Sequence, residues 1–274
     1  MDTFAVFGNP IEHSQSPYIH SLFSAETGIF HPYGRILAPV NDFEILLKQF
    51  FDKGGLGANI TLPFKERAYL FCNQHTERSS FIGAINTIKK QPNGILLGDN
   101  TDGIGLLSDL QRLSLLRHNS HVLLVGAGGA ARGVIASLLS YGCKLVLTNR
   151  NFLRAQKLVE VFYHLGNICA LPLDHLMYPE YDLIINATSI GLQGNIPPIL
   201  PESLITPSIG CYDMFYQKDD DTPFLSWCRR QGAYRCSDGL GMLVGQAAHS
   251  FYLWHGVLPS ILSVLKTFQK EKAI

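Results

Sequence analysis

The hydrophobic positions of this chain alternate between two spacings. Short apolar runs rich in branched side chains predict strands, and apolar residues three or four positions apart predict helices. The runs predict strands at 2–7, 35–40, 58–62, 84–88, 95–98, 121–125, 144–148, 168–171, 182–187 and 209–212. The helical spacing predicts helices at 16–27, 43–51, from 63, from 103 to about 113, at 131–139 and 237–255, and from 259. Alternating strands and helices predict an α/β fold.

Polar side chains repeatedly stand at the ends of apolar strands in the first hundred residues, including Ser, Asn, Thr, Lys and Asp. In an α/β sheet such ends lie around one crevice, so we expect these side chains to face a common ligand. A turn at 91–94 predicts that the strands on either side of it form a hairpin.

One stretch predicts a dinucleotide site. The apolar run 121–125 leads into Gly126-Ala127-Gly128-Gly129-Ala130, and the helical spacing follows directly. Gly126 permits a tight turn, Gly128 lets the backbone approach a pyrophosphate, and Ala131 packs helix on strand. The phosphates would lie against the amino end of the helix. An ordinary strand-to-helix turn is the alternative interpretation of these glycines.

The end of the next strand indicates which dinucleotide binds. NAD sites usually carry an acid there, but this chain has Asn149-Arg150, with Arg154 one helical turn further on. Guanidinium groups match the geometry of a phosphate, so we predict NADP(H). The alternative is that Arg150 and Arg154 are solvated charges on one helix.

The composition excludes several classes of protein. Of 274 residues, 46% are hydrophobic and 16% are charged, as in globular proteins, and 22 Lys and Arg balance 22 Asp and Glu. We therefore expect no nucleic-acid or membrane partner. The six cysteines show neither C-x-x-C nor metal spacing, and no run is long enough to span a membrane. We predict reduced thiols, no metal, and a cytoplasmic protein.

Several polar residues have both a structural and a functional interpretation. Ser16 before Pro17 predicts a helix N-cap, whereas Ser14 is not explained by that cap. Two hydroxyls at a helix start can hold a carboxylate. Asn59 is unfavourable in a strand and needs a specific partner, and Gln246 is an amide among apolar neighbours. Taken alone, Lys65 is most simply a solvated helix lysine.

Together these motifs resemble the shikimate dehydrogenase family over essentially the full chain. The resemblance rests on six segments in order: 8–17 (GNPIEHSQSP), 59–65 (NITLPFK), 83–87 (GAINT), 98–103 (GDNTDG), the glycine turn with Asn149, Arg150 and Arg154, and 238–246 (DGLGMLVGQ). The family usually continues Asn-Arg with Thr, where this chain has Asn151. This difference concerns one hydroxyl contact to the 2′-phosphate.

The resemblance implies the domain organisation. A substrate-binding catalytic domain at 1–103 would be completed by the C-terminal helices at 239–274. A Rossmann-type NADP-binding domain would occupy 104–238, with a cleft between the two domains. The resemblance also implies a monomer or a homodimer.

The resemblance further implies NADPH-dependent reversible reduction of 3-dehydroshikimate to shikimate by hydride transfer at C3, in chorismate and aromatic amino-acid biosynthesis. Lys65 would be the general acid/base, assisted by Asp102. The implied substrate-binding residues are Ser14, Ser16, Asn59, Thr61, Asn86, Asp102, Tyr216 and Gln246. The implied cofactor-binding residues are Glu77, Gly126, Ala127, Gly128, Gly129, Ala130, Asn149, Arg150, Arg154, Thr188, Met214 and Gly239.

Two alternative functions remain. One is a quinate/shikimate dehydrogenase with dual cofactor use. Arg150 argues against a preference for NAD in such an enzyme. The other is a non-catalytic NADP-binding sensor or scaffold, which would need the glycines but not both Lys65 and Asp102.

Overall fold

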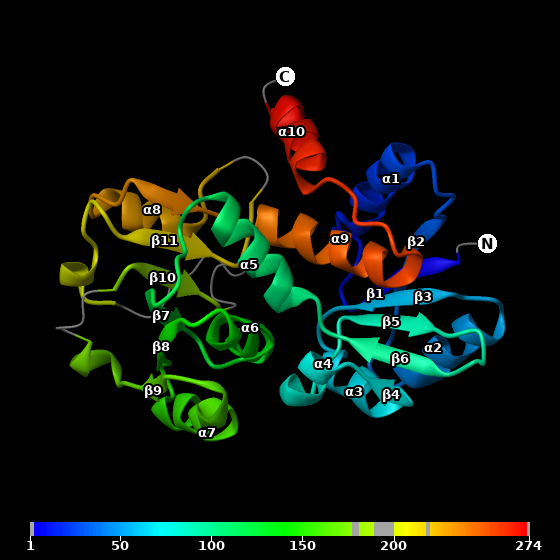
Figure 1. Cartoon of the computed structure of the whole chain (residues 1–274), viewed down its shortest axis with the longest axis horizontal. Coiled ribbons are helices and arrows are strands. Elements are labelled where there is room, and N and C mark those ends of the chain that lie inside the picture. The colour runs from blue at the N-terminus through cyan, green and yellow to red at the C-terminus, as the bar shows by residue number, and fades with distance from the viewer. Residues whose placement is uncertain (1–2, 177–180, 189–199, 218–219, 273–274) are drawn as a thin grey trace. The chain divides into compact units, whose positions relative to one another are not determined.

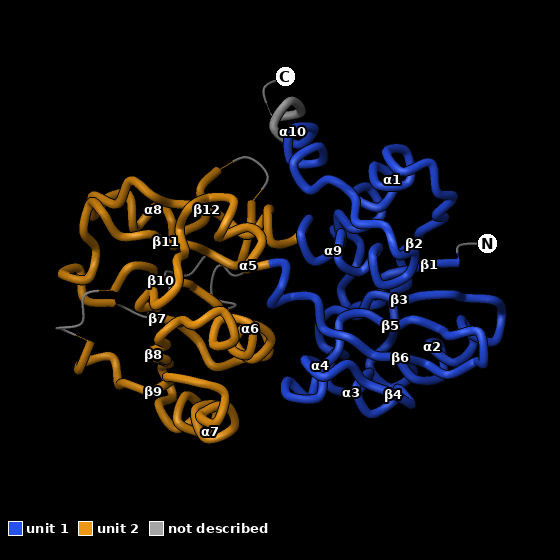
Figure 2. Tube along the Cα trace, in the orientation of Figure 1, with its two compact units in different colours: residues 1–105, 244–271 blue, residues 106–243, 272–274 orange. Residues whose placement is uncertain are grey.

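The computed structural model describes residues 3–176, 181–188, 200–217 and 220–272 (Figure 1). The chain forms two units (Figure 2). Unit 1 comprises residues 1–105 and 244–271, and unit 2 comprises residues 106–243 and 272–274. All three boundaries fall within helices, namely α5 (Asp102–Arg112), α9 (Leu240–His255) and α10 (Ile261–Lys272).

Unit 1 is built on a mixed sheet of order β2-β1-β3-β5-β6-β4. Its strands are β1 (Phe4–Gly8), β2 (Tyr33–Leu37), β3 (Gly57–Ile60), β4 (Gln74–His75), β5 (Thr87–Lys90) and β6 (Leu96–Asp99). Strand β1 runs parallel to β2 and β3, whereas β5 runs antiparallel to β3 and β6. The pairing of β5 with β6 confirms the predicted hairpin.

Helices cover both faces of this sheet. They are α1 (Ser16–Thr27), α2 (Phe43–Asp52), α3 (Lys65–Phe71), α4 (Glu77–Ile82) and the unit 1 part of α9. Helix α10 (Ile261–Lys272) packs on α1, where the ring centroids of Phe268 and Tyr18 lie 5.5 Å apart. Successive residues of β1 point to opposite faces. Phe7 joins the core with Phe43 and Phe64, whose rings stack 4.4 Å apart. Phe4 instead contacts Trp254 of α9, with ring centroids 4.9 Å apart.

Unit 2 is built on a parallel sheet of order β12-β11-β10-β7-β8-β9. Its strands are β7 (His121–Val125), β8 (Lys144–Thr148), β9 (Ile168–Ala170), β10 (Leu183–Asn186), β11 (Gly210–Asp213) and β12 (Arg235–Ser237). Counted within the unit, this is the order 3-2-1-4-5-6 of a doubly wound dinucleotide-binding sheet. The predicted Rossmann-type fold is therefore confirmed.

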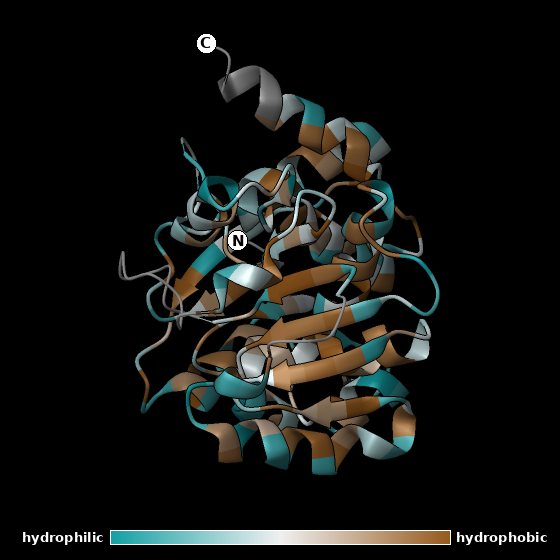
Figure 3. Cartoon of the chain, turned by 90° about the vertical axis from the view of Figure 1, so that its left-hand side faces the viewer, coloured by the Kyte–Doolittle hydropathy of each residue, from teal (hydrophilic) through white to brown (hydrophobic). Residues whose placement is uncertain are grey.

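The four central strands of unit 2, namely β7, β8, β10 and β11, are buried on both faces, as their near-continuous apolar sequence predicts. Val122 and Leu124 pack in one core cluster with α6 (Gly129–Ser140) and α7 (Phe152–Phe162). Leu123 and Val125 pack in another with α8 (Pro223–Arg230). Figure 3 faces this unit and shows its strands as hydrophobic bands. Short 3-10 helices occur at Tyr163–Leu165, Leu173–His175 and Glu202–Leu204.

Several predicted element boundaries were wrong. The strand expected at 84–88 begins at Thr87, because the Ile85 amide bonds to the Lys65 carbonyl outside the sheet. The helix expected from Pro63 begins at Lys65, since residues 61–64 first form a hydrogen-bonded turn. The last helix likewise begins at Ile261 instead of Pro259.

Other elements were not predicted at all, namely β4, α4, α8 and β12. The boundary within α9 places residues 239–243 in unit 2. Gly241 explains this placement, because a Cβ atom there would lie 1.9 Å from an Asp109 carboxylate oxygen. The two residues are packed in direct contact.

Candidate active site

Lys65 and Asp102 form an ion pair in unit 1. Lys65 is the first residue of α3 and Asp102 the first residue of α5. Lys65 Nζ lies 2.5 Å from Asp102 Oδ2, and the two side chains are 24% and 10% exposed. The contact joins residues 37 positions apart in the sequence. The ammonium group thus has a fixed partner and retains access to solvent.

Asn86 holds the other oxygen of this carboxylate. Its Nδ2 donates to Asp102 Oδ1 at 2.7 Å and lies 2.9 Å from Thr101 Oγ1. Its Oδ1 accepts from the Thr101 backbone amide at 2.9 Å. Gln246 of α9 lies at the edge of this group, with its Oε1 3.3 Å from Asn86 Nδ2. Asp102 is therefore oriented from two sides before any ligand binds.

A second buried amide extends the same network. Asn59, at the end of β3, donates from Nδ2 to the Asn86 carbonyl at 3.0 Å and to Ser250 Oγ at 3.0 Å. Its Oδ1 accepts from the Tyr33 hydroxyl at 2.7 Å. Ser250 also lies 2.7 Å from Thr87 Oγ1. The polar partners that Asn59 was predicted to need are thus supplied within the protein.

Ser14 and Ser16 lie at the start of α1, but the predicted cap was wrong. The N-cap position is Gln15, Ser16 is the first helical residue, and the cap residue makes no side-chain hydrogen bond to the helix. The Ser14 hydroxyl instead accepts from the Ser16 amide at 3.3 Å. Ser16 is buried and its side chain hydrogen bonds with Tyr33. Both hydroxyls therefore lie at the ordered start of α1.

The remaining predicted residues of unit 1 lie at different depths. Thr61 directly follows β3 and is half-buried, and its methyl group fills the space where a Gly8 side chain would stand. Glu77 is exposed in the first turn of α4.

One ion pair that supports this part of the sheet was not predicted from the sequence. Asp99 is fully buried at the end of β6 and pairs with Arg78 of α4 through both carboxylate oxygens. Thr76 also donates to Asp99, at 2.6 Å. Burial opposes ionisation, but the hydrogen bonds and charge of Arg78 outweigh it and hold the pKa of Asp99 below its usual value. No local sequence pattern marks Arg78 as the partner of this acid.

In unit 2, the glycine turn has the geometry of a phosphate cradle. Gly126 has φ +118°, and a Cβ atom there would lie 3.0 Å from the Ala187 carbonyl oxygen. Gly128 is the N-cap residue of α6, and the Cβ positions at Gly128 and Gly129 face open space. Ala131 behind them is fully buried in the core. Backbone N–H groups at a helix start with no side chains over them suit an anionic pyrophosphate.

The residues predicted to choose the cofactor follow β8. Asn149 donates to the Asn151 carbonyl at 2.9 Å, and Asn151 is the N-cap of α7. Arg150 precedes this helix and Arg154 lies in its first turn, so the two are not charges on one helix. Both are exposed, and within the described residues neither pairs with a carboxylate. Two available guanidinium groups suit a phosphate.

Thr188 is linked to the ends of two neighbouring strands of unit 2. Its hydroxyl donates to Asn186 Oδ1 at 2.8 Å, and Asn186 donates to Asp213 Oδ1 at 3.0 Å. Burial raises the pKa of Asp213 to about 6, although hydrogen bonds from Thr222, the Phe215 amide and Asn186 oppose this.

Met214 and Tyr216 follow β11 and are half-buried. Gly239 packs against this segment, because a Cβ atom there would lie 2.3 Å from the Met214 carbonyl oxygen. The glycine is thus required for the close approach of the two backbones.

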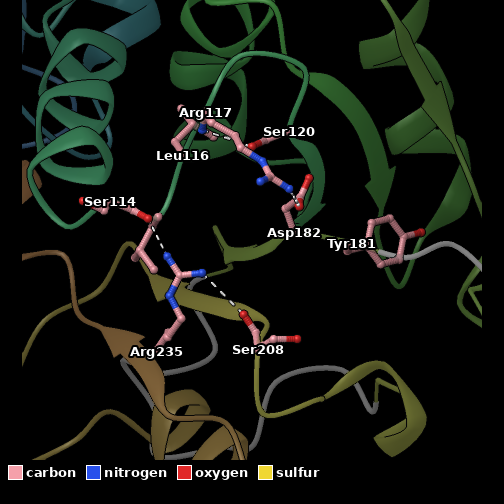
Figure 4. Close-up of a pocket in the computed structure, with 9 residues that line it drawn as sticks. Ser114, Leu116, Arg117, Ser120, Tyr181, Asp182, Ser208 and Arg235 are labelled. Carbon is pink, nitrogen blue, oxygen red and sulfur yellow. Dashed lines mark hydrogen bonds and ion pairs between the residues drawn. The ribbon is translucent and has the colours of Figure 1, made fainter.

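A pocket of about 350 Å³ lies elsewhere in unit 2 (Figure 4). It is lined by Ser114, Leu115, Leu116, Arg117, Ser120, Tyr181, Asp182, Ser208 and Arg235. These residues lie at the amino ends of the strands, whereas ligands of open α/β sheets bind at the carboxyl ends. Arg117 pairs with Asp182, and Arg235 bonds to the Ser114 and Ser208 carbonyls. We therefore do not assign the active site to this pocket.

In the part of the chain that the structure describes, no group of three His, Cys, Asp or Glu residues is arranged to hold a metal ion. None of the described helices combines the length and the apolar character that crossing a bilayer requires.

Models of three protein families match the sequence. The shikimate dehydrogenase substrate binding domain matches residues 6–88, and the shikimate/quinate 5-dehydrogenase model matches residues 110–193. The shikimate 5′-dehydrogenase C-terminal domain matches residues 239–267.

Solved structures match over nearly the whole chain. An Ael1 enzyme from Pseudomonas putida is 38% identical, with 98% of each chain covered and a TM-score of 0.91. Shikimate dehydrogenase from Aquifex aeolicus is 30% identical, with 97% of this chain and 96% of that chain covered and a TM-score of 0.87. Shikimate 5-dehydrogenase from Thermus thermophilus, in complex with NADP(H) and shikimate, is 32% identical, with 97% and 98% covered and a TM-score of 0.86. The chain belongs to the shikimate dehydrogenase family of oxidoreductases.

Proposed function

We propose that this protein catalyses the reversible, NADP(H)-dependent reduction of 3-dehydroshikimate to shikimate, a step of chorismate and aromatic amino-acid biosynthesis. The observation that carries the proposal is the Lys65–Asp102 pair at the accessible edge of a buried polar network. A sensor that only binds NADP would not need this pair. The Thermus thermophilus enzyme in complex with NADP(H) and shikimate supports the choice of ligands.

Lys65 acts as the general acid/base in this proposal. In the direction of reduction its ammonium group donates a proton to the oxygen on C3 of the substrate, and in oxidation the neutral amine accepts that proton. Asp102 holds Lys65 Nζ at 2.5 Å and so fixes the position of the proton donor. NADP(H), when bound, supplies or accepts the hydride at C3.

The other polar residues of unit 1 bind or orient the substrate. Ser14 and Ser16 hold its carboxylate, and Thr61 and Gln246 contact its hydroxyl groups. Asn59 and Asn86 are 6% and 3% exposed and their amides bond internally, so they act by keeping Asp102 and its neighbours in place.

The cofactor is held by unit 2. The backbone of residues 126–130 receives the pyrophosphate, and Asn149, Arg150 and Arg154 receive the 2′-phosphate. Thr188, Met214 and Gly239 border the nicotinamide. The open space at the Gly128 and Gly129 Cβ positions and the exposure of both arginines support this assignment.

The test is an initial-rate assay at 340 nm with shikimate and quinate, each with NADP and NAD. We expect kcat/KM to be highest for shikimate with NADP, because Arg150 and Arg154 suit the extra phosphate. Equal rates with shikimate and quinate would instead favour a quinate/shikimate dehydrogenase. Folded protein without turnover of either acid would refute the proposal.

A further inference from the structure

An arginine that belongs to none of the motifs above holds the loop carrying Ser14. Arg35 lies on β2, and its Nε and Nη2 both donate to the Ser14 carbonyl, at 3.0 and 2.7 Å. The contact joins residues 21 positions apart, so the strand and not the loop sequence fixes this backbone. Two bonds from one planar guanidinium group restrain both the position and the direction of the carbonyl.

The neighbouring residue on the same face of β2 supports the second serine of the loop. Tyr33 and Arg35 are two positions apart in the strand and point to the same side of the sheet. Tyr33 bonds with Ser16 and donates to Asn59. One strand face thus supports the Ser14 backbone and the Ser16 hydroxyl at the start of α1.

The Arg35 side chain also leaves a positive charge uncompensated. Within the described residues no carboxylate lies at ion-pair distance from it, and only the Ser14 carbonyl accepts its hydrogen bonds. The two N–H groups of Nη1 and the second N–H group of Nη2 therefore remain available as donors to another acceptor. Arg67 and Arg78 of the same unit, by contrast, are paired with Glu44 and Asp99.

We propose that Arg35 is a specificity-determining residue, which positions the Ser14 loop and supplies the positive charge that recognises the carboxylate of the substrate. The inference rests on the proposed function, because it assumes that Ser14 and Ser16 face a carboxylate. A serine pair by itself offers neutral donors and accepts other polar groups equally well. A guanidinium group beside it favours an anion, since charge-assisted hydrogen bonds are the stronger ones.

The experiment compares Arg35→Met and Arg35→Lys with wild type, using shikimate and its uncharged methyl ester. For shikimate we expect Arg35→Met to raise KM by about tenfold and to leave kcat within about twofold. Arg35→Lys keeps the positive charge but loses the paired donors of the planar guanidinium group. Its KM for shikimate should therefore lie between the values for wild type and Arg35→Met. With the methyl ester, as substrate or as competitive inhibitor, the wild type and Arg35→Met should differ much less.

Lys48→Met is the matched control, because Lys48 is an exposed cation of unit 1 whose partner is Asp52 on its own helix. Its KM should equal that of wild type. In wild type alone, salt should raise KM for shikimate and leave that for the ester unchanged, which tests the charge without a variant.

Two results would overturn the inference. An unchanged KM for shikimate in Arg35→Met would show that the guanidinium has no part in recognition. An equal rise for shikimate and the ester would show that it supports the loop only as structure. Wild-type protein that turns over neither shikimate nor quinate would instead refute the proposed function. Failure of the inference and failure of the proposed function are therefore distinguishable.

Discussion

The two units prepare their ligand sites in opposite ways. In unit 1 the polar groups are already bonded to one another, since Asp102 is held by Lys65 and Asn86 before any substrate is present. In unit 2 the glycine turn offers bare backbone, and Arg150 and Arg154 are exposed, with no acidic partner among the described residues. Proton transfer needs a donor at a defined position, whereas a dinucleotide brings its own charges to available donors. In the proposed function, the protein itself therefore positions the catalytic groups, whereas the cofactor-binding groups keep donors available for the ligand.

Removal of Lys65 should have the largest effect. Lys65→Met deletes the proton donor, so kcat should fall by about 10²–10⁴-fold while shikimate binding, measured by calorimetry, changes little. Lys65→Gln is a second variant in case the unpaired Asp102 destabilises the fold, and Lys48→Met is the control. Normal turnover in a folded Lys65 variant would remove the catalytic role from the ion pair.

The arginines of unit 2 should have the next largest effect. Arg150→Ala with Arg154→Ala should raise KM for NADP by roughly tenfold to hundredfold and leave KM for NAD unchanged, because only NADP carries the 2′-phosphate. Lys157→Ala is the control, because Lys157 is an exposed cation of α7, the helix that carries Arg154. A similar loss with both cofactors would mean that the arginines do not select the phosphate.

Acid should distinguish the stabilities of the two units. Unit 1 contains three imidazoles hydrogen-bonded in series, with His31 Nε2 3.1 Å from His20 Nδ1 and His255 Nε2 2.9 Å from His31 Nδ1. Burial lowers the pKa of His31 to about 3, with the charge of His255 as a further cause, and burial also lowers the pKa of His20. These groups stay neutral in the folded state at a pH where the unfolded chain binds protons.

The direction in which stability changes with pH follows from this difference in proton binding. The contribution of His31 to stability is complete above the unfolded pKa of about 6.5 and is lost as the pH falls toward 3, by about 2 kcal/mol between pH 6.5 and 5. Asp213 of unit 2 acts in the opposite direction. Its pKa is raised to about 6, so lowering the pH through 6 protonates it and relieves the cost of burying its charge.

Hydrogen-exchange protection at pH 7.5 and 5.0 tests this prediction. Amides of unit 1 should lose protection on acidification relative to amides of unit 2, and His31→Gln should reduce the difference. Equal losses in both units, unchanged in His31→Gln, would contradict it.

Much of the fold was accessible from the sequence because its signals are local. The apolar runs at 121–125 and 144–148 coincide with β7 and β8, and the glycine turn with the start of α6. Strand β4 has two residues and helix α4 has six, too few to establish a period, so both were missed. The Thr222–Pro223 start of α8 is a recognisable cap signal that the sequence analysis overlooked.

The sequence by itself determined the α/β class, the position of the glycine turn, the replacement of an acid by Arg150, and the motif that carries Lys65. Only the tertiary structure decided which side chains are partners. It brought Lys65 to Asp102, Arg35 to the Ser14 carbonyl, and Asn59 to Ser250, which is 191 positions away. The reason is physical. Hydrophobic period and turn residues govern local backbone conformation, whereas hydrogen-bond partners depend on strand order and register, which no short stretch of sequence encodes.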